Sequence, residues 1–331
     1  MNYAMQDRKR ESGAAAAQIA AKGSRWQWIF LMYLLLAMAS VRTKAFITIG
    51  YFNGALEHRH QDLLNGVSTA PNQYRLLEYY VPEWIHSLFH VSVTDAYIAQ
   101  CLVWTALIYL TCHLYLRKWF DLKVSVIGTL FLAATMQWTY FDHLKESEPL
   151  NLLIFILGFY AIREDSWTWL LRLLVVGSFN KLTVIYLPAV YFQCGFRVIA
   201  FSRLITRTAL LFLTVVIISV GIYWYYRNSP YETDLVQISY NLSGLAASLR
   251  LLPLSFYRAW HLGVLFLYGI FWITAFISWK AKPLFLRRAA LIIPFFIFGH
   301  LMIARIDESR LFLPLAPIII PMGLWYLFPG R

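Results

Sequence analysis

The chain concentrates its ionisable side chains in a few short polar segments that separate long apolar runs. Four of these segments carry such groups, and all but the third hold both acids and bases: Glu57, His58, Arg59, His60, Asp62, Arg75, Glu78 and Glu83; Asp142, His143, Lys145, Glu146 and Glu148; Asn180, Lys181 and Thr183; Arg305, Asp307, Glu308 and Arg310. Arginine and lysine bind phosphate through charge-assisted hydrogen bonds, and a carboxylate can accept a proton. The mixture therefore predicts recognition of an anionic group, with an acid available as a base.

Each polar segment also has a plainer interpretation. FDHLKESEP could be a solvated loop, and IDESR could be a hydrated turn with a local ion pair. Arg75, Asn180 and Lys181 are harder to explain in this way, because they interrupt runs that otherwise have an apolar, buried pattern. Ionisable groups at membrane depth are costly and usually mark a site or a pathway. The hypothesis of one shared site rests on the convergence of four distant segments.

The apolar runs between these segments indicate a membrane protein. Of the 331 residues, 60% are hydrophobic and only 14% are charged, whereas soluble domains carry about 25% charged residues. The net charge of +12 would suit a nucleic-acid partner, but the basic residues recur in short clusters between apolar runs. The composition therefore favours an integral membrane protein and excludes nucleic acid as a partner.

Ten apolar segments are candidates for membrane helices. They are 26–48, 94–116, 124–141, 150–163, 166–179, 182–196, 208–226, 259–278, 289–304 and 311–328. A helix needs about 20 apolar residues to cross a bilayer, so some of the shorter segments would be re-entrant. The pattern predicts an all-α polytopic helical bundle that forms a single transmembrane domain over 26–331, after an N-terminal tail at 1–25.

The distribution of charge sets the expected orientation. If the tail is cytoplasmic, the inner segments hold 18 of the 29 Lys and Arg residues but only five of the 17 Asp and Glu residues. An excess of basic residues is typical of the cytoplasmic side, so all four polar segments are expected on the outer face. Arg42 and Lys44, near the outer end of the first segment, are the exception: either they reach toward the interface or the first helix ends early.

The first outer loop, residues 50–93, is long and is expected to contain a helix of its own. Aromatic and apolar residues recur at roughly helical spacing between Gln73 and His90. Such an amphipathic helix would lie in the membrane interface, with its polar side facing the site.

Other motifs are weak or missing. The sequence has no phosphate-binding loop, dinucleotide fingerprint, zinc-protease helix or nucleophile elbow. Cys101, Cys112 and Cys194 lie in apolar segments without metal-binding spacing and are expected to be buried. The glycosylation sequon at Asn241 falls in an expected outer loop and would matter only in a eukaryote.

The topology and three short motifs resemble the polytopic membrane glycosyltransferases of the GT-C type. The motifs are PNQYRLL at Pro71–Leu77, ESRLFLPLAP at Glu308–Pro317 and the turn NKLT at residues 180–183. Bacterial proteins of this group show similar elements in the first outer loop, late in the chain and at a short-helix turn. The resemblance implies a multi-pass protein of the bacterial plasma membrane whose active face is extracytoplasmic.

The resemblance also implies a reaction, in which a sugar passes from a polyprenyl-phosphate carrier to an acceptor. The expected catalytic residues are Asp62 and Glu57, and the expected substrate-binding residues are Arg75, Lys181, Asn180, Arg310, Glu308, His60, Glu146 and Glu148. The cations would hold the donor phosphate, Glu308 would orient Arg310, and Asp62 or Glu57 would act as the base. The stretch after the first apolar run, TIGYFNG, lacks the Asp that such enzymes commonly place there. A divalent cation could assist, although the sequence shows no clear ligand set.

Two other classes of function stay open. A transporter or flippase of a lipid-linked or anionic solute would use the same outer cations without chemistry, although the chain shows no internal repeat. A non-catalytic membrane assembly protein would tolerate Asp62→Asn and Arg75→Ala, whereas an enzyme would lose activity. Membrane lipids are expected partners in every case, and the sequence leaves the oligomeric state open.

Overall fold

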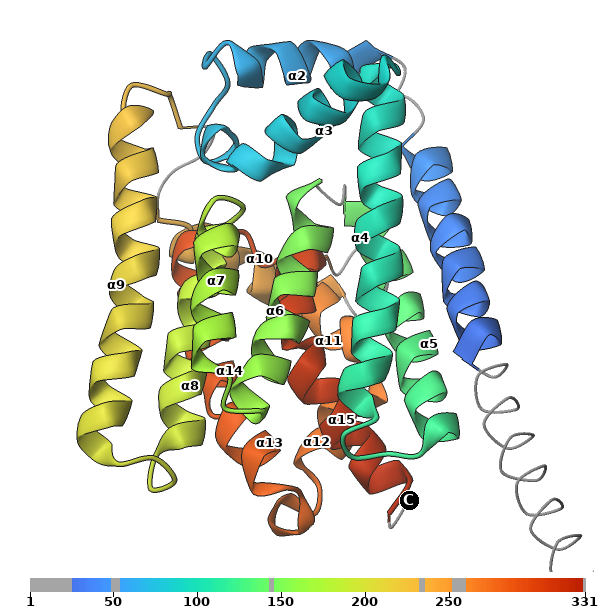
Figure 1. The fold of residues 1–331 in the computed structure, drawn as a ribbon, viewed down its shortest axis with the longest axis vertical. Helices are drawn as coiled ribbons and strands as arrows, with labels where there is room; N and C mark the ends of the chain where they lie inside the picture. Colours follow the sequence, from blue (N-terminus) through green and yellow to red (C-terminus); the bar gives the residue numbers. More distant parts are fainter. Residues whose placement is uncertain (1–25, 49–53, 143–145, 232–235, 252–259, 330–331) are drawn as a thin grey trace, which may run out of the picture.

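The computed structural model describes residues 26–48, 54–142, 146–231, 236–251 and 260–329. Within these ranges every regular element is a helix, and the long helices run side by side as a bundle (Figure 1). An isolated parallel bridge joins Ala70 to Tyr231. The expected all-α helical fold is therefore confirmed.

Short connections join most of the helices along the chain. The helix Trp26–Ile47 is followed by α2 (Leu56–Leu64), η2 (Asn72–Tyr74), α3 (Leu76–Phe89), α4 (Val93–Leu116), α5 (Leu122–Trp138), η3 (Thr139–Asp142), α6 (Ser147–Arg163), α7 (Trp167–Ser178), η4 (Leu182–Ile185), α8 (Tyr186–Gly195), α9 (Phe201–Tyr225), α10 (Ile238–Leu251), η6 (Trp260–Leu262), α11 (Gly263–Tyr268), α12 (Ile270–Phe276), η7 (Trp279–Ala281), α13 (Leu284–Ala289), α14 (Ile292–Ile303), η8 (Ser309–Leu315) and α15 (Ala316–Leu327). The η elements are single turns or short runs of 3-10 helix.

Five helical stretches are long and apolar enough to cross a membrane. They are Trp26–Ile47, Val93–Leu116, Phe201–Tyr225, Leu284–Ile303 and Ser309–Leu327. Three further apolar helices, at Leu122–Trp138, Trp167–Ser178 and Leu182–Gly195, are shorter. The apolar segments of the sequence do fall on helical regions where they are described, but the expected number of about ten spans is not confirmed.

Capping side chains fix where two of the bundle helices begin. At the start of α4, Ser92 Oγ accepts a hydrogen bond of 3.0 Å from the amide of Asp95. At the start of α5, Asp121 Oδ1 accepts one of 2.9 Å from the amide of Val124. Such side chains satisfy amides of the first turn that have no partner inside the helix. The two helices therefore begin one and two residues before the starts predicted at 94 and 124.

The bundle has a packed centre and an apolar periphery. In the apolar window of Ser309–Leu327, 83% of the residues are buried, whereas in that of α9 only 17% are buried. The exposed residues of α9 include large apolar side chains such as Ile217 and Val220. An apolar surface of this length on the outside of a fold suits a hydrocarbon environment. The structure thus supports an integral membrane protein.

A row of buried polar contacts joins the helix Trp26–Ile47 to its neighbours. Tyr33 Oη lies 2.8 Å from Nδ1 of His113, and Ser40 Oγ lies 2.7 Å from Oη of Tyr109. Hydrogen bonds of this kind hold membrane helices together where the hydrophobic effect gives no preference between protein and lipid. The row continues to Lys44, which is buried and does not reach toward the interface as the sequence suggested.

Helices α2 and α3 lie across one end of the bundle, which we call the capped end (Figure 1). Helix α3 confirms the helix expected between Gln73 and His90, although its first residues form the separate turn η2. Trp84 and Phe89 are exposed on α3, whereas Glu78 is buried. The helix therefore presents apolar side chains outward and a carboxylate to the bundle, as an interfacial helix above a polar site would.

Residues 238–251 correct an expectation, because α10 replaces the expected loop around Asn241. The Asn241 side chain is fully buried. Its Nδ2 donates to the carbonyls of Leu301 and Ala304 at 2.8 and 2.7 Å, and its Oδ1 accepts from the amide of Ile306 at 3.1 Å. The moderately polar sequence of α10 had too little hydropathy to stand out as a helix. The Asn241 side chain thus fixes the end of α14 through three hydrogen bonds to its backbone and to the residues that follow it.

The segment 259–278 was expected to form one span, but the structure divides it into three shorter helices, η6, α11 and α12. The break between α11 and α12 lies at Gly269, which has a φ of 50°. Glycine takes this left-handed conformation without the steric cost that a Cβ imposes. The bend lets α12 pack along α15 at the centre of the bundle.

Candidate functional site

Ion pairs at the capped end join six separate parts of the chain. Nine side chains take part, and we call them the ion network: Lys44, Arg59, Arg75, Glu78, Glu146, Glu148, Lys181, Glu308 and Arg310. Seven of the nine side chains are no more than 11% exposed. Such burial of so many ionised groups is tolerated only when the groups are paired.

Glu148 is the centre of one half of the network. Its Oε1 lies 2.5 Å from Nζ of Lys181 and 3.8 Å from Nε of Arg310. Arg310 in turn donates to Glu308 at 2.5 Å. Glu148 is in the first turn of α6, Lys181 follows α7, and Arg310 is in η8. Three elements that are distant in the sequence therefore meet at one carboxylate.

Arg59 is the centre of the other half. Its guanidinium donates to Glu78 on α3 and to Glu146, just before α6, the latter at 2.7 Å. Glu146 also lies 3.6 Å from Nζ of Lys44 at the end of the first helix. Arg75 completes this half, because its guanidinium lies 3.6 Å from Glu78. The covering helix α2 is thereby attached to both α3 and the bundle.

Ser147 connects the two halves and shows why α6 is central to the site. Its hydroxyl accepts a hydrogen bond of 3.4 Å from Arg75, and its carbonyl accepts one of 3.0 Å from Nδ2 of Asn180. One turn further along α6, Oδ1 of Asn151 accepts a hydrogen bond of 3.0 Å from the hydroxyl of Thr183. These contacts hold the α7–η4 turn over the start of α6, so that Lys181 faces Glu148.

The network holds more positive than negative side chains, with five Lys and Arg against four Glu. Burial is the main cause that lowers the pKa of Lys181; the cations of Arg75 and Arg310 lower it further, while Glu148 opposes them, and the result is about 8. Burial alone would raise the pKa of Glu78, but Arg59 and Arg75 outweigh it and bring that pKa to about 2. The site therefore favours an additional anion.

Buried oxygens beside Lys181 have no hydrogen-bond donor among the described residues. They are Oε2 of Glu148 and Oδ1 of Asn180. Buried acceptors are costly without a donor. They are therefore suitable partners for hydroxyl groups of a ligand, which a bare phosphate dianion does not offer.

An apolar groove of about 390 Å³ opens beside the network, between α3, α9 and the end of α7. Leu76 and Tyr80 line it on one side and Ile217 and Tyr225 on the other. Phe179 also lines it and directly precedes Asn180 and Lys181. The groove thus brings apolar surface to the edge of the ion network.

Most of the predicted binding residues meet in this site, but the predicted catalytic residues do not. The structure brings together Arg75, Asn180, Lys181, Glu146, Glu148, Glu308 and Arg310. Glu57 is exposed on α2, and Asp62 lies 3.9 Å from His58 on the same helix. His60 is buried apart from the network, between Tyr97 at 3.1 Å and Glu83 at 2.9 Å. His143 and Lys145 lie outside the described residues.

Three members of the network were not singled out from the sequence as site residues. Lys44 was expected at the interface because it lies close to a helix end, and Arg59 and Glu78 were two charges among many in the first outer loop. The spacing of Arg59 from Leu56 and Leu63 was the available signal, because these positions share one face of a helix. This spacing is informative only if residues 56–64 are first predicted to form a helix.

Comparison with protein-family profiles, curated proteins and solved structures finds no match to this chain. Among the described residues, no group of three or more His, Cys, Asp or Glu side chains is arranged to hold a metal ion. The chemistry of the site therefore has to be inferred from its own geometry.

Proposed function

We propose that the protein is a membrane glycosyltransferase that transfers a sugar from a polyprenyl-phosphate carrier to an acceptor on the extracytoplasmic face. The observation that carries the proposal is the meeting of Lys181 and Arg310 on buried Glu148, beside Arg75 on Ser147. Three cations from distant elements suit a phosphate diester whose charge grows as the sugar leaves. The neighbouring groove gives the lipid chain an apolar surface.

The reaction breaks the bond between the anomeric carbon and the phosphate oxygen and forms one to the acceptor oxygen. The bonding electrons leave with the polyprenyl phosphate, and the acceptor proton passes to a base. Lys181, Arg75 and Arg310 would stabilise the departing phosphate. Oε2 of Glu148 and Oδ1 of Asn180 would accept hydrogen bonds from sugar hydroxyls. Asp62 and Glu57, the bases expected from the sequence, lie on α2 outside the ion network, so neither is assigned as the base.

The test is release of polyprenyl phosphate from a panel of hexosyl and pentosyl donors by protein in liposomes. The Lys181→Met variant is expected to lose about 10²–10³-fold in rate, the usual effect of removing one stabilising donor. Lys118→Met is the matched control, because Lys118 pairs with Glu164 on a partly exposed surface outside the network. Transport of the intact donor without release would instead favour the flippase.

A further inference from the structure

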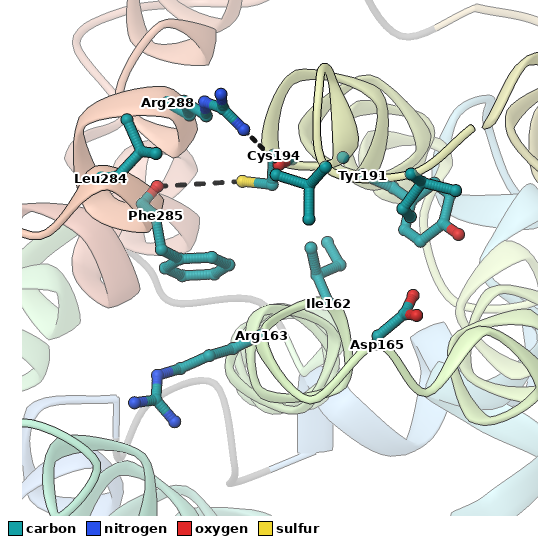
Figure 2. A pocket seen from close by; sticks show the side chains of 11 residues that line it. Ile162, Arg163, Asp165, Tyr191, Cys194, Leu284, Phe285 and Arg288 are labelled. Atoms are coloured by element: carbon teal, nitrogen blue, oxygen red, sulfur yellow. Dashed lines mark hydrogen bonds between the residues drawn. The ribbon is translucent and has the colours of Figure 1, made fainter. Parts of the chain in front are cut away.

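A second cavity lies away from the ion network, among the ends of α6 and α8 and the start of α13 (Figure 2). Its volume is about 290 Å³. Arg163, Asp165 and Arg288 supply the charged part of its lining, and the rest is mostly apolar. These residues lie in segments that the charge distribution assigns to the cytoplasmic side.

Of the two arginines at this cavity, Arg288 lies along its wall, whereas the guanidinium of Arg163 is turned away from Arg288 (Figure 2). Arg288 donates to the carbonyl of Cys194 at 2.9 Å (Figure 2). Arg163 donates to the carbonyl of Lys118 at 3.1 Å and lies 4.7 Å from the ring of Trp119. A guanidinium that is already oriented loses little freedom when it binds an anion, and its fork matches a phosphate.

The acids near the cavity are already paired. Asp165 lies 3.7 Å from Arg207, and Glu164 lies 2.9 Å from Arg163 and 3.1 Å from Lys118. Of the charged residues that line the cavity, Arg163 and Arg288 are basic and Asp165 is acidic. The charge balance therefore favours an anionic ligand over a zwitterionic one.

The apolar part of the lining decides which phosphate-bearing ligand fits. Ile162, Ile199 and Phe285 line the cavity, and so do Val198 and Leu284, which are 69% and 50% exposed. The apolar wall thus continues onto the outer surface of the bundle, where acyl chains would lie. A free phosphate ion would gain nothing from this wall, whereas a phospholipid would use both parts. Basic pockets between membrane helices on the cytoplasmic side commonly hold acidic lipid head groups.

We infer that this cavity binds the head group of an anionic phospholipid, with Arg288 on its phosphate and the acyl chains along Val198 and Leu284. The site is separate from the ion network and goes beyond the proposed glycosyl transfer. Its occupation would connect α6, α8 and α13 at this end of the bundle.

The test is native mass spectrometry of delipidated protein titrated with phosphatidylglycerol or with phosphatidylcholine of the same acyl chains. Phosphatidylglycerol is expected to bind at least tenfold more tightly, and Arg288→Gln to reduce that preference about tenfold. Arg203→Gln is the matched control, because Arg203 is exposed and does not line the cavity. Arg288→Lys, which keeps the charge but loses the planar fork, serves as a second variant if Arg288→Gln does not fold.

Equal affinity for the two lipids would overturn the inference, and so would an equal loss in Arg203→Gln. Competition by soluble glycerol phosphate at the same concentration as the lipid would show a site for free phosphate instead, and would also overturn it. Release of polyprenyl phosphate in the donor assay depends on the other site, so either proposal can fail without the other.

Discussion

The side chains of Lys181 and Glu148 meet at 2.5 Å although the residues are 33 positions apart in the chain. Glu148 is 1% exposed and Lys181 is 10% exposed, so each charge depends on the other for compensation. Arg310 shares the same carboxylate at 3.8 Å. The pair fixes the α7–η4 turn against α6 and at the same time leaves the site rich in cations.

Replacing Glu148 by Gln is expected to cost about 3–5 kcal/mol in unfolding free energy, because it leaves buried Lys181 without its carboxylate and leaves Arg310 with Glu308 alone. Thermal unfolding in detergent measures the effect. Glu164→Gln is the control, because Glu164 is 39% exposed and its pairs should contribute less than about 1 kcal/mol. Equal shifts in the two variants would contradict the central place of Glu148.

Donor binding is expected to weaken as the pH rises through about 8, because Lys181 then loses the proton that makes it a cation. The same lowered pKa means that the folded protein binds fewer protons than the unfolded chain between pH 8 and 10.5, so this residue's contribution to stability rises with pH there. Lys181→Arg keeps its charge and should move the loss of binding to higher pH. Identical pH profiles for both proteins would exclude Lys181 as the titrating group.

Arg59→Ala is expected to loosen the cap, because it removes the cation that joins α2 to Glu78 and Glu146. Hydrogen–deuterium exchange should rise in α2 and α3. His58→Ala, which changes an 83% exposed side chain on the same helix, should leave exchange unchanged. Glu78 contributes to this attachment fully above about pH 4.5, and its contribution is lost as the pH falls toward its pKa of about 2. Unaltered exchange in Arg59→Ala would show that packing alone holds the cap.

Asn241→Ala is expected to cost about 1–3 kcal/mol, because the buried amide of Ile306 and the carbonyls of Leu301 and Ala304 lose their partner. Asn228→Ala, at an exposed position, provides the comparison in the same unfolding experiment. A negligible change in Asn241→Ala would mean that the end of α14 is held by other contacts.

Sequence reasoning found most of the long apolar helices and six of the nine network residues for the same reason. Apolar runs mark helices, and a charge that interrupts such a run, as Lys181 and Arg75 do, must find a partner when the run is buried. What could not be predicted was the direction in which each charge points. Glu57 and Arg59 are two positions apart in one polar stretch, yet only Arg59 enters the network, because residues two apart point to nearly opposite sides of α2.

Lys44 and Asn241 show a second limit of the sequence. A lysine near a helix end and a sequon in a polar segment both suggest exposure, but each is buried by contacts with residues far along the chain. Their partners, Glu146 for Lys44 and the end of α14 for Asn241, are set by packing. Tertiary contacts at such distances leave no local pattern to detect.

The most direct test of the proposed site is mass spectrometry of the lipids that co-purify with the protein in mild detergent. An unrelated polytopic protein from the same host is the reference. Enrichment of polyprenyl phosphate or its glycosylated form is predicted, with loss in Lys181→Met and retention in Lys118→Met. Bulk phospholipid alone in the wild-type protein would contradict a lipid-phosphate site at the ion network.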